Sequence, residues 1–164
     1  MIYLGIDPGL TGTGVSLVSN VHDDITQLEN TVIYSDGSLS KLAWHIRAAN
    51  IASKLSLWLK VCNHYPGIDD AIIELPAFWG TGSVVGNAAA KSGDLIALAA
   101  TTGVIIAALQ ALSIDVVCYT PQQWKGQLPK EAVAARINRR MGPIPYRNHA
   151  NDALGIVLYH LGVF

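Results

Sequence analysis

Cysteine and charged residues are scarce in this sequence of 164 residues. Its two cysteines, Cys62 and Cys118, lie far apart and form no spacing typical of a metal or redox motif, so a reduced, intracellular setting is the default. Charged residues make up only 14% and hydrophobic residues 51%, which excludes a disordered chain and fits a compact globular protein. The length predicts one domain spanning residues 1–164.

The sequence also lacks a basic leader followed by an apolar core, so we expect no signal peptide. One stretch, Leu95 to Leu112, carries no charge and approaches the ~20 residues that a membrane-spanning helix needs. It is, however, rich in alanine and contains Thr101, Gly103 and Gln110. We therefore predict a helix buried in a soluble domain or at a dimer interface, no membrane partner, and a cytoplasmic location.

The net charge of −1 argues against a uniformly basic nucleic-acid-binding protein. The charge is unevenly distributed, because positions 120–148 hold six of the eleven basic residues and a single acid, Glu131. Two interpretations remain open: a solvated surface, or a surface that contacts a phosphate backbone. The six residues are Lys125, Lys130, Arg136, Arg139, Arg140 and Arg147.

Apolar runs and turn residues predict an α/β domain with one mixed five-stranded sheet flanked by helices, in the order β-β-β-α-β-α-β-α-α. A long helix is expected from about Leu39 to Cys62, with Leu42, Ile46, Ala49, Leu55 and Leu59 on its apolar face. Thr120 and Pro121 are typical of the start of a short helix. The final helix is expected from about Asn148 to Leu161.

Four side chains at the ends of these elements suggest a site. Asp7 and Glu74 each end an apolar run that reads as a strand, where a lone carboxylate is costly unless it is paired or holds a cation. His149 and Asp152 are spaced i, i+3 and so project from one face of the last helix. Any one of these acids could instead be a cap or a surface group. If the last helix packs beside the first strand, however, all four converge.

Three neighbouring carboxylates repel one another, and a pair of divalent cations would relieve that repulsion. Oxygen ligands with at most one nitrogen favour Mg²⁺ or Mn²⁺ over Zn²⁺. Two such ions suit the in-line attack of water on a phosphodiester. The residues thus predict two ions in one active site.

Several motifs carry a resemblance that spans nearly the whole chain. They are Gly5-Ile6-Asp7-Pro8-Gly9 with Thr11-Gly12-Thr13-Gly14, then Ile72-Ile73-Glu74, Tyr119-Thr120-Pro121-Gln122-Gln123-Trp124-Lys125-Gly126, and His149-Ala150-Asn151-Asp152-Ala153-Leu154-Gly155-Ile156. Together they resemble the RuvC-type Holliday junction resolvases, which have a ribonuclease H-like fold. Actin-like ATPases and sugar kinases open with a related turn, but an ATPase of that type needs a second lobe that a chain of this length cannot supply.

The resemblance implies that Asp7, Glu74 and Asp152 are the acidic metal ligands. His149 stands where many members have a further Asp, and an imidazole there can ligate a metal or handle a proton. Lys125 and Lys130 resemble the family's basic residues near the active site. We predict that Lys125 is also one of the catalytic residues. The implied activity is a Mg²⁺- or Mn²⁺-dependent endonuclease that cuts four-way DNA by paired symmetric nicks.

Further expectations concern partners. Phe78 and Trp79 are candidates for the aromatic wedge that the family uses at the junction centre, although either could simply pack locally. The basic residues Arg136, Arg139, Arg140 and Arg147 would contact DNA. The resemblance implies a two-fold dimer, with the alanine-rich stretch as a candidate interface. It also implies a bacterial or phage-infected cell. The sequence does not indicate whether a helicase partner exists.

Two other functions stay open. The loop after Glu74 is longer than is usual in the family, which would suit a nuclease for a broader range of branched DNA. His149 in place of an acid would suit a catalytically silent junction-binding protein.

Overall fold

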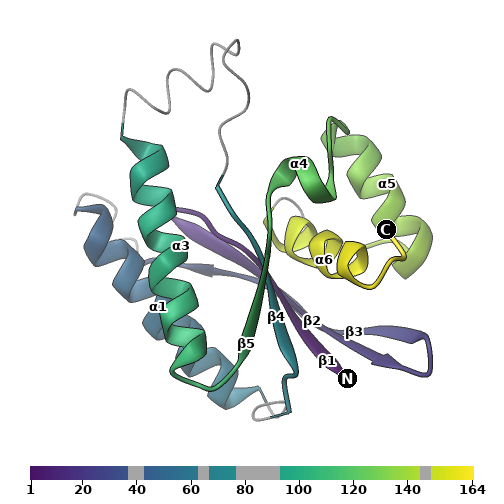
Figure 1. Cartoon of the computed structure of the whole chain (residues 1–164), viewed down its shortest axis with the longest axis horizontal. Coiled ribbons are helices and arrows are strands. Elements are labelled where there is room, and N and C mark those ends of the chain that lie inside the picture. The colour runs from purple at the N-terminus through teal and green to yellow at the C-terminus, as the bar shows by residue number, and fades with distance from the viewer. Residues whose placement is uncertain (37–42, 63–66, 77–92, 145–148) are drawn as a thin grey trace.

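The computed structural model describes residues 1–36, 43–62, 67–76, 93–144 and 149–164. These residues form five strands and five helices arranged around a single sheet (Figure 1). The strands are β1 (Ile2–Asp7), β2 (Gly12–Val21), β3 (Asp24–Tyr34), β4 (Asp70–Glu74) and β5 (Asp115–Tyr119). The helices are α1 (Trp44–Val61), α3 (Asp94–Gln110), α4 (Pro121–Trp124), α5 (Lys130–Met141) and α6 (His149–His160), which makes five with these labels.

The sheet is mixed and has the strand order β3-β2-β1-β4-β5. The first three strands form an antiparallel meander, and β4 and β5 then add in parallel beside β1. Since β1 and β4 are parallel neighbours, their carboxyl ends meet at the same edge of the sheet. Ile6 pairs with Ile73, so the next residue along each strand, Asp7 and Glu74, reaches that edge together.

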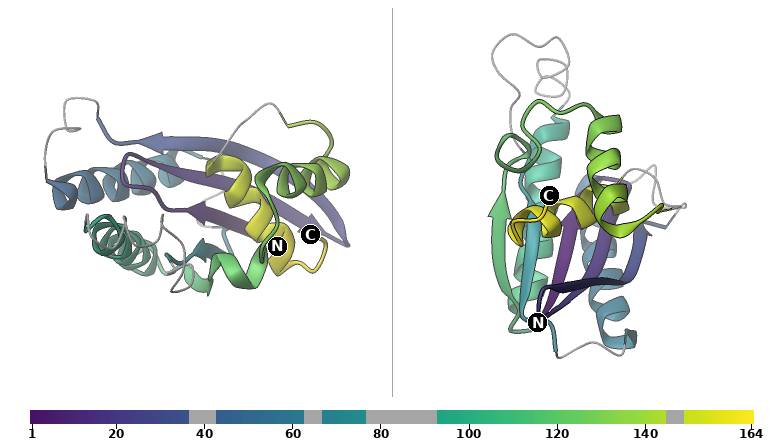
Figure 2. Two further views of the ribbon diagram at one scale, coloured as in Figure 1. Left: turned by 90° about the horizontal axis from the view of Figure 1, so that it is seen from above. Right: turned by 90° about the vertical axis from the view of Figure 1, so that its right-hand side faces the viewer.

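The two faces of the sheet are covered by different helices. Leu4, Ile6 and Ile73 belong to a core cluster shared with α1 and α3, whereas Tyr3 and Ile72 pack in a second cluster with α5 and α6. The three views in Figures 1 and 2 agree with this division into layers. Side chains alternate between the two faces along a strand, so Asp7 lies on the same face as Tyr3, and Glu74 lies on the same face as Ile72. Both acids therefore lie on the α6 face.

Glycine lets α6 sit close against the sheet. A Cβ built on Gly14 of β2 would lie 2.0 Å from the His149 carbonyl oxygen, and one on Gly5 of β1 would lie 1.9 Å from the Ala153 carbonyl oxygen. Neither contact is compatible with a side chain. These two strand glycines thus allow the final helix to approach the first hairpin closely.

The predicted order of elements is confirmed, with α4 as a separate short helix within it. Helix α1 begins at Trp44, later than expected, because Ala43 has an extended backbone (ψ 146°). Asp36, which precedes the helix, binds the side chains of Asn50 and Lys54 on it. Residues 39–42 of the predicted helix, among them Leu42 of its apolar face, lie outside the described part of the chain.

The apolar face of α1 is only partly as predicted. Leu55 and Leu59 are buried, but Ile46 and Ala49 are exposed. The remaining buried positions are Ala48, Ile51 and Ala52. Ile51, Leu55 and Leu59 of this buried face share a core cluster with Ile105 and Leu109 of α3.

The uncharged stretch forms most of α3, which lies against α1 (Figure 1). Within the described ranges, no helix is both long enough and apolar enough to cross a membrane. The outer surface of α3 exposes apolar side chains to solvent, among them Ile96, which is 71% exposed, and Val104, which is 39% exposed.

Candidate active site

The four predicted side chains meet at the carboxyl edge of β1 and β4. Asp7 ends β1 and is only 7% exposed. The first residue of α6, His149, places its Nδ1 atom 2.5 Å from Asp7 Oδ2. Asp152 follows one helical turn later on the same face of α6. The predicted convergence of the first strand and the last helix is therefore what the structure contains.

Lys125 connects the other two carboxylates. It lies at the end of α4, which Thr120 and Gln123 fix through a reciprocal capping box. Its Nζ atom lies 3.0 Å from Glu74 Oε2 and 3.2 Å from Asp152 Oδ2. A single cationic atom thus bridges an acid from the sheet and an acid from α6.

Burial and charge shift the protonation equilibria of this cluster. Burial is the main reason why the pKa of Asp7 is raised, and His149 opposes it by hydrogen bonding. Burial also raises the pKa of Glu74, with the charge of Asp7 adding to the effect. Both acids are less readily ionised than in water and gain from a nearby cation.

The acids in turn raise the pKa values of the two basic groups, His149 and Lys125. The hydrogen bond to Asp7 is the main reason why the pKa of His149 is raised, which favours the imidazolium form. Burial lowers the pKa of Lys125, but the charges of Glu74 and Asp152 outweigh it, so that its pKa is raised overall. The acids of the cluster therefore favour the protonated, positively charged forms of both His149 and Lys125.

This donor set fits a hard divalent cation. Asp7, Glu74 and Asp152 supply carboxylate oxygens, and the space between Glu74 and Asp152 already accommodates one cationic atom. In the arrangement described here, with Lys125 and His149 bound to the acids, no three His, Cys, Asp or Glu side chains of the described segments come close enough to ligate one ion. A metal ion bound between Glu74 and Asp152 would take the place that the Lys125 Nζ atom occupies.

Trp124 is part of this cluster and was not predicted. Its Nε1 atom donates a hydrogen bond to Glu74 Oε2 at 2.6 Å, and its ring is 3% exposed. The Lys125 Nζ atom lies 4.7 Å from the centroid of the same ring. The indole therefore orients both an acid and its counter-ion. The signal available in the sequence was its place, directly before Lys125 on a helix that follows a strand.

An open cavity of about 350 Å³ adjoins the carboxylates. Lys130, the first residue of α5, lines it together with Glu74, Lys125 and Asp152. Its other walls are apolar and come from Pro121, Leu128, Pro129 and Val133. Lys130 is thus brought to the site, as the sequence predicted.

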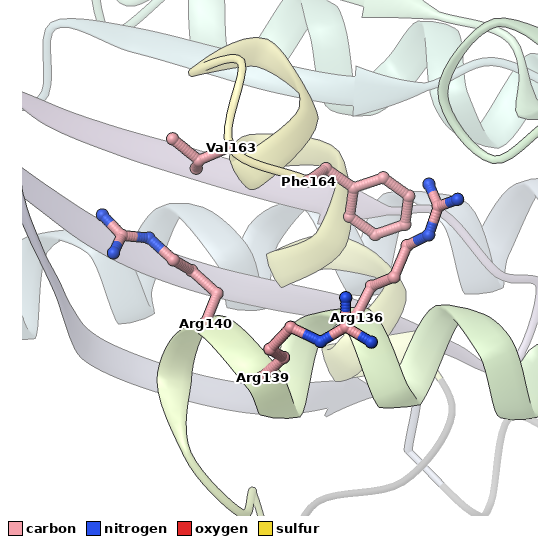
Figure 3. A pocket seen from close by; sticks show the side chains of 5 residues that line it. All are labelled: Arg136, Arg139, Arg140, Val163 and Phe164. Carbon is pink, nitrogen blue, oxygen red and sulfur yellow. The ribbon is translucent and has the colours of Figure 1, made fainter.

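The other basic residues are not part of this cavity. Arg136, Arg139 and Arg140 line a separate cavity farther along α5 (Figure 3). The segment 120–148 therefore does not form one uniform basic surface, since Lys125 is committed to two acids. Phe78, Trp79 and Arg147 lie outside the residues that the structure describes.

Comparison with solved structures relates this architecture to known proteins. RuvC from T. thermophilus in complex with a Holliday junction substrate matches with a TM-score of 0.73 and 24% identity, over 98% of this chain and 92% of that chain. The fowlpox virus Holliday junction resolvase matches at 0.53 and 12%, over 99% and 98%. The yeast mitochondrial Holliday junction resolvase Ydc2 matches at 0.54 and 11%, over 96% and 77%.

These likenesses confirm the predicted fold class, a mixed five-stranded sheet with flanking helices as in RuvC. The resemblance to RuvC-type resolvases that the motifs suggested is confirmed at the level of structure. The sequence matches no protein-family model and no curated protein.

Proposed function

We propose that this chain is a single-domain, metal-dependent endonuclease that cuts four-way DNA junctions by paired symmetric nicks. The observation that carries the proposal is the convergence of Asp7, Glu74 and Asp152 at one sheet edge of a RuvC-like fold. Solved proteins with this fold are described as Holliday junction resolvases, one of them bound to its junction.

Asp7, Glu74, Asp152 and His149 would hold two Mg²⁺ or Mn²⁺ ions. Such ions lower the pKa of an attacking water and stabilise the charge on a leaving 3′ oxygen. The chain's own residues prepare this site: Trp124 fixes Glu74, and the position of His149 against Asp7 suits it for ligation or for proton transfer.

Lys125 and Lys130 would act on the DNA. Both line the cavity that adjoins the carboxylates, where a scissile phosphate would lie close to either ammonium group. Lys125 holds the acids in the absence of substrate and would move to the phosphate when a metal takes its place. Lysine suits this exchange because its ammonium group is a compact charge on a flexible chain.

Paired nicks require two active sites related by symmetry, so we propose a homodimer. Helix α3 is the best candidate for the interface, because it is uncharged after its first residue and exposes Ile96 and Val104. Its alanines and Gly103 would allow a helix of a second copy to approach closely.

The experiment uses labelled four-way junction, Y-fork and linear duplex, each with Mg²⁺, Mn²⁺ or EDTA. Symmetric nicks in the junction alone support the proposal, and cuts in the fork as well favour the broader branched-DNA nuclease. Asp7→Asn should abolish cleavage and retain junction binding. The matched control is Asp115→Asn, an exposed acid at the start of β5, which should cleave normally.

A second candidate function is junction binding without catalysis. One observation favours it: all three acids are already bound by His149 or Lys125 within the protein. Binding without cleavage in every metal would establish this function and overturn the first. Loss of both binding and cleavage in Asp7→Asn would instead identify Asp7 as a residue needed for folding.

A further inference from the structure

A second positively charged cavity lies on α5, away from the acidic cluster. It measures about 390 Å³ and is lined by three arginines and by two residues at the end of the chain. Figure 3 shows Arg136 rising from α5 beside Phe164, whereas Arg139 lies along the helix and Arg140 extends to the other side. The lining residues are Arg136, Arg139, Arg140, Val163 and Phe164.

The charges in this cavity are not neutralised by the protein. Within the described ranges, none of the three guanidinium groups forms an ion pair with an acid. Arg140 makes only a long contact, 3.5 Å, to the backbone oxygen of Asp23. Three like charges in one exposed cavity repel each other, and an anion would relieve that repulsion. Guanidinium groups are also the side chains best shaped to bind phosphate.

Helix electrostatics explain part of this pattern but not all of it. Arg139 and Arg140 lie in the last turn of α5, where a cation stabilises the helix dipole by about 0.3–1 kcal/mol. Arg136 lies a turn earlier and gains little from that effect. Its guanidinium instead stacks on the Phe164 ring, 5.5 Å from the centroid, which holds it at the cavity.

The same ring connects this cavity to the active site. Phe164 packs edge-on against Trp124, with the ring centroids 5.4 Å apart, and Trp124 holds Glu74. A group bound at Arg136 is therefore held in a fixed relation to the proposed catalytic acids. Helix α5 also joins the two places directly, since it begins at Lys130 beside the acids.

We propose that the arginine cavity binds backbone phosphates of the same DNA strand that enters the active site, a few nucleotides away from the phosphate at the acidic cluster. The separation follows from the helix, because Arg136 to Arg140 lie about 9–15 Å from Lys130 along α5. This inference rests on the proposed function for its choice of ligand, and it adds where the flanking DNA runs.

The test measures junction affinity against salt concentration in EDTA, so that no cleavage interferes. Each arginine–phosphate contact lowers the slope of log affinity against log salt by ~0.9. The triple variant Arg136→Gln, Arg139→Gln, Arg140→Gln should reduce the magnitude of the slope by about 2–3. Arg139→Gln alone should reduce it by roughly 1. The matched control is Lys60→Gln, an exposed cation on α1 across the sheet, which should leave the slope unchanged.

Two results would overturn the proposal: an unchanged slope in the triple variant, or an equal loss in Lys60→Gln. A lower melting temperature with an unchanged slope would assign the arginines to helix stability alone. Phe164→Leu gives a second measurement, because it frees Arg136 without removing charge and should weaken junction binding. These readouts are independent of cleavage. A protein that binds through the arginines but never cuts would disprove the proposed nuclease and leave this inference standing.

Discussion

Trp124 should position Glu74, so we expect Trp124→Phe to slow cleavage far more than it weakens DNA binding. The indole donates its hydrogen bond to Glu74 at 2.6 Å from a buried position and rests edge-on against Phe164. Phenylalanine retains an aromatic ring in this contact but has no donor. Glu74 would then keep Lys125 as its main partner and lose the group that fixes its direction.

The size of the effect follows from the hydrogen bond. A hydrogen bond to a charged group contributes about 1.5–3 kcal/mol, and each 1.36 kcal/mol in the barrier is tenfold in rate. If the whole contribution is lost in the transition state, cleavage slows about 10- to 150-fold. Part of this loss would also appear as weaker metal binding, because Glu74 is a proposed ligand.

The assay is single-turnover nicking of a four-way junction at increasing Mg²⁺, with junction binding measured separately in EDTA. Trp58→Phe is the matched control, since Trp58 lies on α1 and packs against the other core cluster. We expect Trp124→Phe to need more Mg²⁺ and to cut slowly, with unchanged binding. Equal rates and equal Mg²⁺ dependence in the two variants would refute the positioning role.

Three further predictions concern the cations and the cap around the site. Lys125→Gln leaves two carboxylates without their bridge and should lower the free energy of unfolding in EDTA by about 1–3 kcal/mol, with Mg²⁺ restoring stability; calorimetry with and without Mg²⁺ measures this. Asp7→Asn removes the carboxylate whose hydrogen bond and charge raise the pKa of His149, so this pKa should fall toward its ordinary 6.5 in metal-free protein, as an NMR titration of the imidazole would reveal. Thr120→Ala removes the capping box and should cost about 1 kcal/mol, whereas Thr120→Ser should preserve thermal stability.

The acidic residues could be found from the sequence because their positions follow from simple rules. A lone acid at the end of an apolar run predicts a strand end, and parallel strands bring their carboxyl ends together. The sequence thus predicted that Asp7 and Glu74 end strands, and that they converge with the last helix if it packs beside the first strand; the parallel pairing of β1 and β4 is what the structure adds. The i, i+3 spacing of His149 and Asp152 likewise needed only helical geometry.

Trp124 could not be found this way, because its role depends on a contact between residues fifty positions apart. An aromatic residue on a short helix is usually part of the core, and this one is buried as well. Ile46 on α1 shows the converse: its apolar character and spacing predicted burial, but the helix buries a face that contains Ile51 and leaves Ile46 exposed. Periodicity identifies a helix more reliably than it fixes the helix rotation.

The charges of the acidic cluster indicate which cations it should hold before and after DNA binds. Three carboxylates with one ammonium leave two negative charges when His149 is neutral, which matches a single divalent cation. Two such cations exceed the charge of the three acids by one, and a scissile phosphate would supply the missing negative charge. With Lys125 still bound to the acids, that balance would again be exceeded. We therefore expect Lys125 to leave the carboxylates when metal ions and phosphate bind, which its flexible side chain at the end of α4 permits.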